Sequence, residues 1–155
     1  ADPGDVVGVQ GDQVPGRLGR RDSPAGSARA AAPAAAFPDR QIVALAGDGG
    51  LAMLLGELLT ISQNNLPVKI VVFDNSSLNF VELEMKAAGF VNFGTDLENP
   101  DFATVARGYG AFGARLERNE DIEGVVADAV RAVTEDRIPA VVHVVADPAK
   151  LLPGM

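Results

Sequence analysis

Two short polar segments, each directly after an apolar run, contain residue types that suit a metal ion. Asp48 lies in Gly47–Gly50 (GDGG) after the run Gln41–Ala46, and Asn75 follows the run Val68–Phe73. Carboxylate and amide oxygens are hard ligands of the kind that Mg²⁺ prefers, and Mg²⁺ often completes its shell with phosphate oxygens and water. The chemistry available to these residues is therefore binding of a phosphorylated ligand through magnesium.

The glycines around Asp48 favour the same kind of ligand. Because they lack a Cβ, Gly47, Gly49 and Gly50 allow the backbone to approach a diphosphate closely and to adopt positive φ angles. A helix predicted to begin at Leu51 would direct its free amino-terminal N–H groups toward the anion. A Gly-Asp-Gly segment alone is weak, because such residues also form ordinary turns, so the context must decide.

The segments around these residues predict an α/β fold, a mostly parallel sheet with helices on both faces. The expected strands are Gln41–Ala46, Val68–Phe73, Ala111–Glu117 and Ala140–Ala146. The expected helices are Leu51–Asn64, Asn79–Ala88, Phe102–Tyr109 and Glu120–Thr134. Asp101 and Asn119 are the expected amino-terminal caps of the last two helices, and Gly110 ends the third. Because parallel strands bind ligands at their carboxyl ends, Asp48 and Asn75 should converge there.

Residues 1–36 differ in composition from the rest of the chain. They contain nine Ala, six Gly and four Pro, and neither an aromatic residue nor a periodic apolar face. We expect this segment to be irregular and disordered, with the folded domain at residues 37–150. A flexible linker is one interpretation, and out-of-frame translation or an artefact of expression is another.

Charge and composition narrow the classes of partner. The 155 residues carry a formal net charge of −8 and no cysteine. The charge disfavours nucleic acid and anionic membranes as partners, and the lack of cysteine excludes disulfides and zinc-thiolate sites. No apolar run approaches the roughly 20 residues of a membrane span. We therefore expect one cytoplasmic domain that binds a small molecule.

The remaining titratable residues have simpler interpretations. His143, the only histidine, lies in a run of valines and is expected to be a strand residue with a satisfied hydrogen bond rather than a base. The acidic side chains that precede the last predicted helix are expected to form its solvated start, and they are Glu117, Glu120, Asp121 and Glu123.

Asn75 lies 27 positions after Asp48, and this Gly-Asp-Gly…Asn pattern resembles the cofactor motif of thiamine-diphosphate enzymes. Within that superfamily, residues 66–73 (LPVKIVVF), 75–81 (NSSLNFV) and 84–86 (EMK) are most similar to the quinone-dependent pyruvate dehydrogenases, or pyruvate oxidases. Acetolactate synthases are the alternative. The resemblance covers about residues 35–150 and implies the carboxy-terminal, diphosphate-binding domain.

The resemblance assigns a role to individual residues. Asp48 and Asn75 would be side-chain ligands of magnesium, and Ser77 would add its backbone carbonyl. Glu84 would be the catalytic residue on the substrate side, although a solvated charge is the simpler interpretation. The residues expected around the cofactor are Gly47, Asp48, Gly49, Gly50, Asn75, Ser77, Leu78, Phe80 and Val81, of which Phe80 and Val81 are equally well explained as the apolar face of a helix.

The family also implies components that this sequence lacks. A separate pyrimidine-binding domain of a partner subunit supplies a Glu that activates the cofactor. In full-length relatives that decarboxylate pyruvate oxidatively, FAD accepts electrons from the thiamine intermediate and passes them to a quinone. A family helix that packs on the sheet is expected to be missing, because residues 26–36 are Ala-rich in its place. We expect a homo-oligomer or a partner chain, weak cofactor binding and no turnover by this polypeptide alone. An enzyme fragment, a cofactor-binding subunit and a degenerate domain without ligand remain open.

Overall fold

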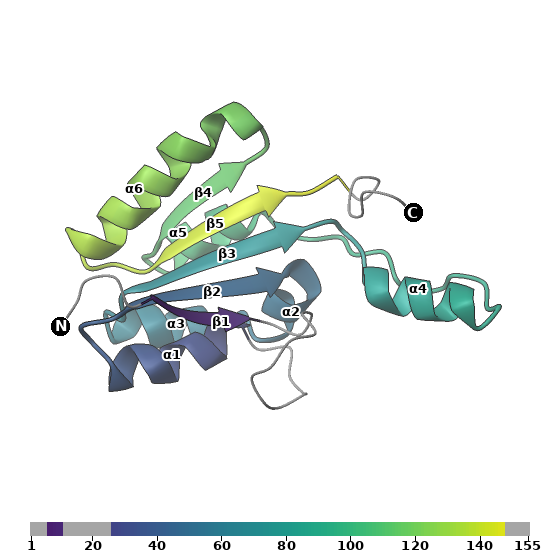
Figure 1. The fold of residues 1–155 in the computed structure, drawn as a ribbon, viewed down its shortest axis with the longest axis horizontal. Helices are drawn as coiled ribbons and strands as arrows, with labels where there is room; N and C mark the ends of the chain where they lie inside the picture. Colours follow the sequence, from purple (N-terminus) through teal and green to yellow (C-terminus); the bar gives the residue numbers. More distant parts are fainter. Residues whose placement is uncertain (1–5, 11–25, 148–155) are drawn as a thin grey trace.

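The computed structural model describes residues 6–10 and 26–147. Within them, strands form a single parallel sheet in the order β1-β2-β3-β5-β4, so the predicted α/β architecture is confirmed (Figure 1). The four predicted strands begin and end within one residue of the observed ones. The strands are β1 (Val6–Gln10), β2 (Gln41–Gly47), β3 (Val68–Asp74), β4 (Phe112–Leu116) and β5 (Ala140–Val145).

Helices pack on both faces of this sheet, as the sequence predicts. One core cluster joins β2, β3 and β5 to four helices, and a second joins β4 and β5 to α6 on the opposite face. Figure 1 shows α4 standing away from the sheet, beyond the carboxyl end of β3. The helices are α1 (Gly26–Ala36), α2 (Asp48–Met53), α3 (Glu57–Gln63), α4 (Asn79–Ala87), α5 (Phe102–Gly108) and α6 (Ile122–Thr134), the last preceded by the 3₁₀ helix η1 (Asn119–Asp121).

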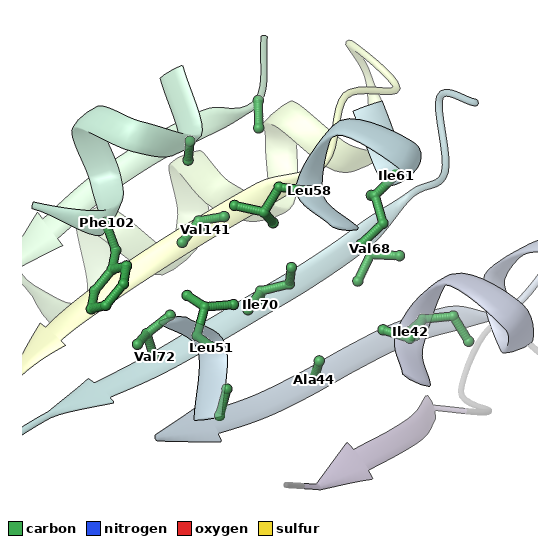
Figure 2. Packing of buried hydrophobic residues seen from close by; sticks show 14 of the residues in the cluster. Ile42, Ala44, Leu51, Leu58, Ile61, Val68, Ile70, Val72, Phe102 and Val141 are labelled. Carbon is green, nitrogen blue, oxygen red and sulfur yellow. The ribbon is translucent and has the colours of Figure 1, made fainter. Parts of the chain in front are cut away.

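The main core consists of aliphatic side chains from alternate positions of β2 and β3 and from the helices above them. Ile42, Ile70 and Val72 on the strands are fully buried, as are Leu51 of α2 and Phe102 of α5 (Figure 2). Alternate strand residues point to the same face, which explains why every second residue of β2 is buried. This core fixes where β2 and β3 end, and therefore where Asp48 and Asn75 lie.

Residues 26–36 differ from the sequence-based prediction. They form helix α1, which contributes Ala30 and Ala34 to the core at 0% and 1% exposure, in spite of Pro33 within the helix. Alanine is the strongest helix former, and its small side chain allows a helix to lie close to a sheet. The expectation of disorder is therefore wrong for residues 26–36 and for strand β1, and so is the expectation that no helix occupies this place. The other residues of 1–36 lie outside the described part of the chain.

Two details of the helices were also predicted incorrectly. The single helix expected over residues 51–64 is divided into α2 and α3 around Gly56, a residue with low helix propensity. Asn119 does not cap α6, because the chain first forms η1 and no side chain accepts a hydrogen bond at the start of α6.

The predicted ends of α5 are confirmed. Oδ1 of Asp101 accepts hydrogen bonds from the backbone N–H groups of Ala103 at 3.0 Å and Thr104 at 3.3 Å. After α5, Gly110 has a φ of +80°, the left-handed conformation that glycine adopts readily. Across the described residues, no helix is both long and apolar enough to cross a bilayer.

Candidate functional site

The carboxyl ends of β2 and β3 bring Asp48 against the segment that contains Asn75. Gly47 at the end of β2 is in register with Phe73 of β3, so the two chains leave the sheet side by side. The backbone N–H of Ser76 donates to Oδ2 of Asp48 at 2.9 Å. The carboxylate of Asp48 therefore contacts the residue that follows Asn75 in the chain. This contact lies at the sheet edge where the sequence predicts that Asp48 and Asn75 approach each other.

The loop after β3, residues 75–77, has a constrained backbone. Ser76 has a φ of +55°, which is uncommon for any residue with a side chain. The N–H of Ser77 donates to Oδ1 of Asn75 at 3.1 Å, and the carbonyl of Ser76 accepts from the N–H of Leu97 at 2.9 Å. The predicted metal ligands here are the side-chain amide of Asn75 and the backbone carbonyl of Ser77. The two bonds orient this amide and the backbone just before this carbonyl.

Asp48 is only 5% exposed, and hydrogen-bond donors surround its carboxylate. Oδ1 accepts from the N–H of Gly49 at 2.8 Å, and Oδ2 accepts from Nδ2 of Asn99 at 2.8 Å as well as from Ser76. Burial raises the pKa of Asp48, and the nearby carboxyl group of Asp74 raises it further, against the lowering by Gly49 and Asn99. A cation at this site would favour the ionised carboxylate.

A chain of hydrogen bonds extends from this loop into the core. Oδ2 of Asp74 lies 2.8 Å from Nε2 of His143, and the other ring nitrogen lies 3.4 Å from Oδ1 of Asp101. Burial of Asp74 acts to raise its pKa, but the donors His143, Asn99 and Ser76 outweigh burial and lower it. His143 is thus a buried strand residue with hydrogen-bond partners, as the sequence predicts.

The glycines beside Asp48 behave differently from the prediction. Gly47 has a φ of −80°, and neither Gly49 nor Gly50 has a positive φ. The reason is that α2 begins at Asp48, so Gly49 and Gly50 already lie in its first turn. At Gly49 a Cβ would lie 2.9 Å from Cδ2 of Leu78, so a side chain at this position would require Leu78 to shift. The predicted cofactor residue Leu78 therefore contacts the Gly-Asp-Gly segment.

Helix α4 carries the predicted substrate-side residues away from this cluster. Phe80 is 55% exposed and Val81 45%, and Glu84 is exposed as well. The acidic residue of α4 that contacts the loop is Glu82, which accepts a hydrogen bond from Oγ of Ser77 at 3.2 Å. The catalytic role of Glu84 remains a prediction.

Reasoning from sequence gave no role in this site to four residues that the structure adds to it. Asp74, Ser76, Asn99 and His143 all bond within it. Only Asp74 and Ser76 gave a signal, because each is adjacent to Asn75 in the chain. Asn99 and His143 reach the site through tertiary folding.

The oxygen donors present are compatible with magnesium that is shared with a phosphate. In the described ranges, no three His, Asp or Glu side chains form a group that could hold a metal by themselves. Asp48 and Asn75 supply two hard oxygens, and further ligands would be the Ser77 carbonyl, water and phosphate oxygens. This composition fits Mg²⁺, which commonly uses one or two carboxylates together with substrate phosphates.

Comparison with known proteins identifies the family to which this chain is related. The family model described as "Thiamine pyrophosphate enzyme, C-terminal TPP binding domain" matches residues 18–144. A Bacillus subtilis protein, YdaP, described as thiamine pyrophosphate-containing, is 32% identical over 117 residues, which cover 76% of this chain and 20% of that protein. A Methanococcus aeolicus protein described as an acetolactate synthase large subunit is 36% identical over 100 residues, covering 61% of this chain and 16% of that protein.

A solved structure agrees with the fold. The thiamine diphosphate-dependent 4-hydroxybenzoylformate decarboxylase of Rhodococcus jostii RHA1 superposes with a TM-score of 0.69 at 26% identity, over 79% of this chain and 23% of that one. This chain thus spans about a fifth of the length of the relatives that it matches. Because the family model matches most of the chain, the chain belongs to the thiamine pyrophosphate enzymes and corresponds to their C-terminal TPP-binding domain.

Proposed function

We propose that this domain binds the diphosphate of thiamine diphosphate through a magnesium ion at the carboxyl ends of β2 and β3. Asp48 and Asn75 would be side-chain ligands and Ser77 a backbone ligand, with Gly47, Gly49, Gly50 and Leu78 beside the cofactor. The observation that supports this most is the hydrogen bond from the Ser76 N–H to Oδ2 of Asp48, which brings the two halves of the motif together. When bound, thiamine diphosphate itself supplies the carbanion chemistry.

The residues of the chain would hold the cofactor without taking part in bond making. Asp48 supplies the negative charge that holds the metal ion, and the metal ion in turn is the cationic partner of the diphosphate. Asn75 supplies a neutral oxygen ligand. Phe80 and Val81 expose apolar surface on α4, and we propose that they contact the cofactor on the side away from the sheet. Glu84, which is also exposed, would face the substrate.

For the complete enzyme we propose a 2-oxo acid substrate, with pyruvate as the first candidate. The support is the resemblance of residues 75–86 to the pyruvate oxidases, which also implies FAD in the complete enzyme and an active site completed by a second copy or a partner chain. An acetolactate synthase is the alternative, and a relative of that description is similar over 100 residues. Pyruvate-dependent reduction of a quinone by the complete enzyme would support the oxidase, and acetolactate formation would support the alternative.

Calorimetric titration tests the binding site directly. Thiamine diphosphate should bind only with Mg²⁺ present, and thiamine without the diphosphate should not bind. Asp48→Asn keeps the size of the side chain and removes its charge, so it should abolish binding. Asp136→Asn makes the same change on the exposed turn after α6 and is the matched control. Magnesium-independent binding, or equal binding by the Asp48→Asn variant, would contradict the proposed site.

A further inference from the structure

Asp74 connects the loop after β3 to the buried interior of the domain. It is 7% exposed, and its two carboxylate oxygens have different partners. Oδ2 lies 2.8 Å from Nε2 of His143, whose side chain is fully buried. Oδ1 accepts hydrogen bonds from the N–H of Ser76 and from Nδ2 of Asn99, both at 2.9 Å. One side of Asp74 is therefore anchored in β5, and the other holds the loop.

The loop needs such an anchor because of its backbone conformation. Ser76 has a φ of +55°, a conformation that costs free energy in a residue with a side chain and persists only where the surroundings enforce it. Its N–H is shared between Asp48 and Asp74, and its Oγ lies 3.2 Å from Oδ1 of Asp74. The carboxylate of Asp74 thus holds Ser76 in this conformation.

Asn99 adds a second link. Its Nδ2 donates to Oδ2 of Asp48 as well as to Oδ1 of Asp74, at 2.8 Å and 2.9 Å. Because the carboxylates of Asp48 and Asp74 both accept from this amide group, they are kept at a fixed separation in spite of their mutual repulsion. The orientation of Asp48 and that of the loop therefore depend on the same donor.

We propose that His143 and Asn99 are positioning residues of the magnesium site, which fix Asp74 and thereby hold the loop that carries Asn75 and Ser77 against Asp48. This inference rests on the proposed function, because the loop is the proposed source of metal ligands. In this proposal neither His143 nor Asn99 is itself a ligand of the metal. Groups that orient metal ligands in this way usually change metal affinity by about 10- to 100-fold when they are removed.

The competing explanation is that His143 only fills space in the core. The ring of Phe102 contacts it edge-on, with centroids 5.2 Å apart and an interplanar angle of 75°. Packing of this kind depends on volume and does not distinguish one ring nitrogen from the other. The positioning role does distinguish them, because Nε2 contacts Asp74 and Nδ1 contacts Asp101.

Two amide variants separate these explanations. The terminal amide of His143→Gln can donate from near the position of Nε2, whereas that of His143→Asn lies near the position of Nδ1. The Gln variant should bind Mg²⁺ and thiamine diphosphate with nearly unchanged affinity, and the Asn variant should lose about 10-fold or more. Equal losses in both variants would overturn the positioning role of His143.

Asn99 supplies a variant outside the core. Its side chain is only partly buried, so Asn99→Ala should fold even if a His143 variant does not. It should weaken binding of Mg²⁺ with thiamine diphosphate by about 10- to 100-fold. Asn64→Ala, which removes an amide donor to the Thr60 carbonyl at the end of α3, is the matched control and should bind normally. Unchanged affinity in Asn99→Ala would overturn its proposed role.

A measurement without ligand keeps this inference separate from the proposed function. Hydrogen exchange of the Ser76 amide reports directly on the loop, because this N–H is bonded to Asp48 and Asp74. Exchange should be faster in Asn99→Ala and His143→Asn than in the unmodified protein and in His143→Gln. If the unmodified protein binds no cofactor, the proposed function fails while this comparison still decides the positioning role. Equal exchange in all four proteins would overturn it.

Discussion

The backbone N–H of Ser76 donates a hydrogen bond to Oδ2 of Asp48, at 2.9 Å and across 28 positions of the chain. This bond joins the first residue of α2, directly after β2, to the loop after β3. Each segment taken alone has the composition of an ordinary turn. Joined, they place a buried carboxylate, an amide oxygen and backbone carbonyls at one edge of the sheet, and this arrangement is the basis of the proposed magnesium site.

Replacing Asp101 by Ala should destabilise the domain. The carboxylate of Asp101 caps α5 through the N–H groups of Ala103 and Thr104 and also contacts Oγ1 of Thr104. Loss of an amino-terminal cap of this type costs about 1 kcal/mol of unfolding free energy. Urea denaturation followed by circular dichroism measures this difference, and a change close to zero would show that the cap contributes little.

The contribution of Asp101 should also depend on pH. Burial acts to raise its pKa, but hydrogen bonds from Thr104, His143 and Ala103 outweigh burial and lower the pKa to about 2, from 3.8. Because the folded state holds the ionised form more tightly, the stabilisation is present above about pH 4 and is lost as the pH falls toward 2. The difference in unfolding free energy between the unmodified protein and Asp101→Asn should therefore shrink over that interval. A difference that stays constant would contradict this assignment.

Strand positions and the approach of Asp48 to the loop that contains Asn75 could be predicted from the sequence. Mostly apolar runs such as Val68–Phe73, which is interrupted only by Lys69, identify buried parallel strands, and parallel strands necessarily end at one edge. Helix α1 was missed because an Ala-rich segment gives no apolar periodicity, although Ala30 and Ala34 pack in the core. The glycine conformations were misjudged because α2 begins three residues earlier than expected.

The hydrogen-bond network behind the site could not be predicted in the same way. Asn99 lies 51 positions from Asp48, and His143 lies 69 positions from Asp74. Neither residue belongs to a local motif, and a histidine among valines gives no indication of its partner. The register of β3 and β5, in which Val72 is opposite His143, creates the contact. Only the assembled sheet determines that register.

Two glycines should respond in opposite ways to replacement by alanine. At Gly113 in β4, a Cβ would lie 2.1 Å from the carbonyl oxygen of Ala103, a backbone atom that cannot move without shifting α5. Gly113→Ala should therefore cost about 1–3 kcal/mol or more. At Gly124 in α6, no atom lies within 4 Å of the added Cβ, so Gly124→Ala should stabilise by about 0.5–1 kcal/mol. Thermal unfolding of both variants checks the packing of α5 against β4, and similar Tm values would contradict it.

Exposed aromatic residues after α4 predict self-association or a partner. Phe90 is 68% exposed and Phe93 86%, and Val91 between them is 87% exposed. Apolar side chains grouped in this way usually mark a surface that another chain covers. The double replacement of Phe90 and Phe93 by Ser should lower both apolar-dye binding and the sedimentation-derived mass at high concentration. If the unmodified protein is a monomer that binds no dye, this expectation is wrong.

The most direct test of the central claim is a thermal-shift experiment on the unmodified chain with Mg²⁺ and thiamine diphosphate, alone and together, at concentrations up to the millimolar range. A ligand that binds only the folded state stabilises it by about 2.7 kcal/mol when its concentration is 100 times Kd. Mg²⁺ and thiamine diphosphate together should raise Tm, each alone should have little effect, and Asp48→Asn should abolish the shift. If Tm is unchanged with both ligands at millimolar concentration, this domain does not bind the cofactor, and only its fold and family remain.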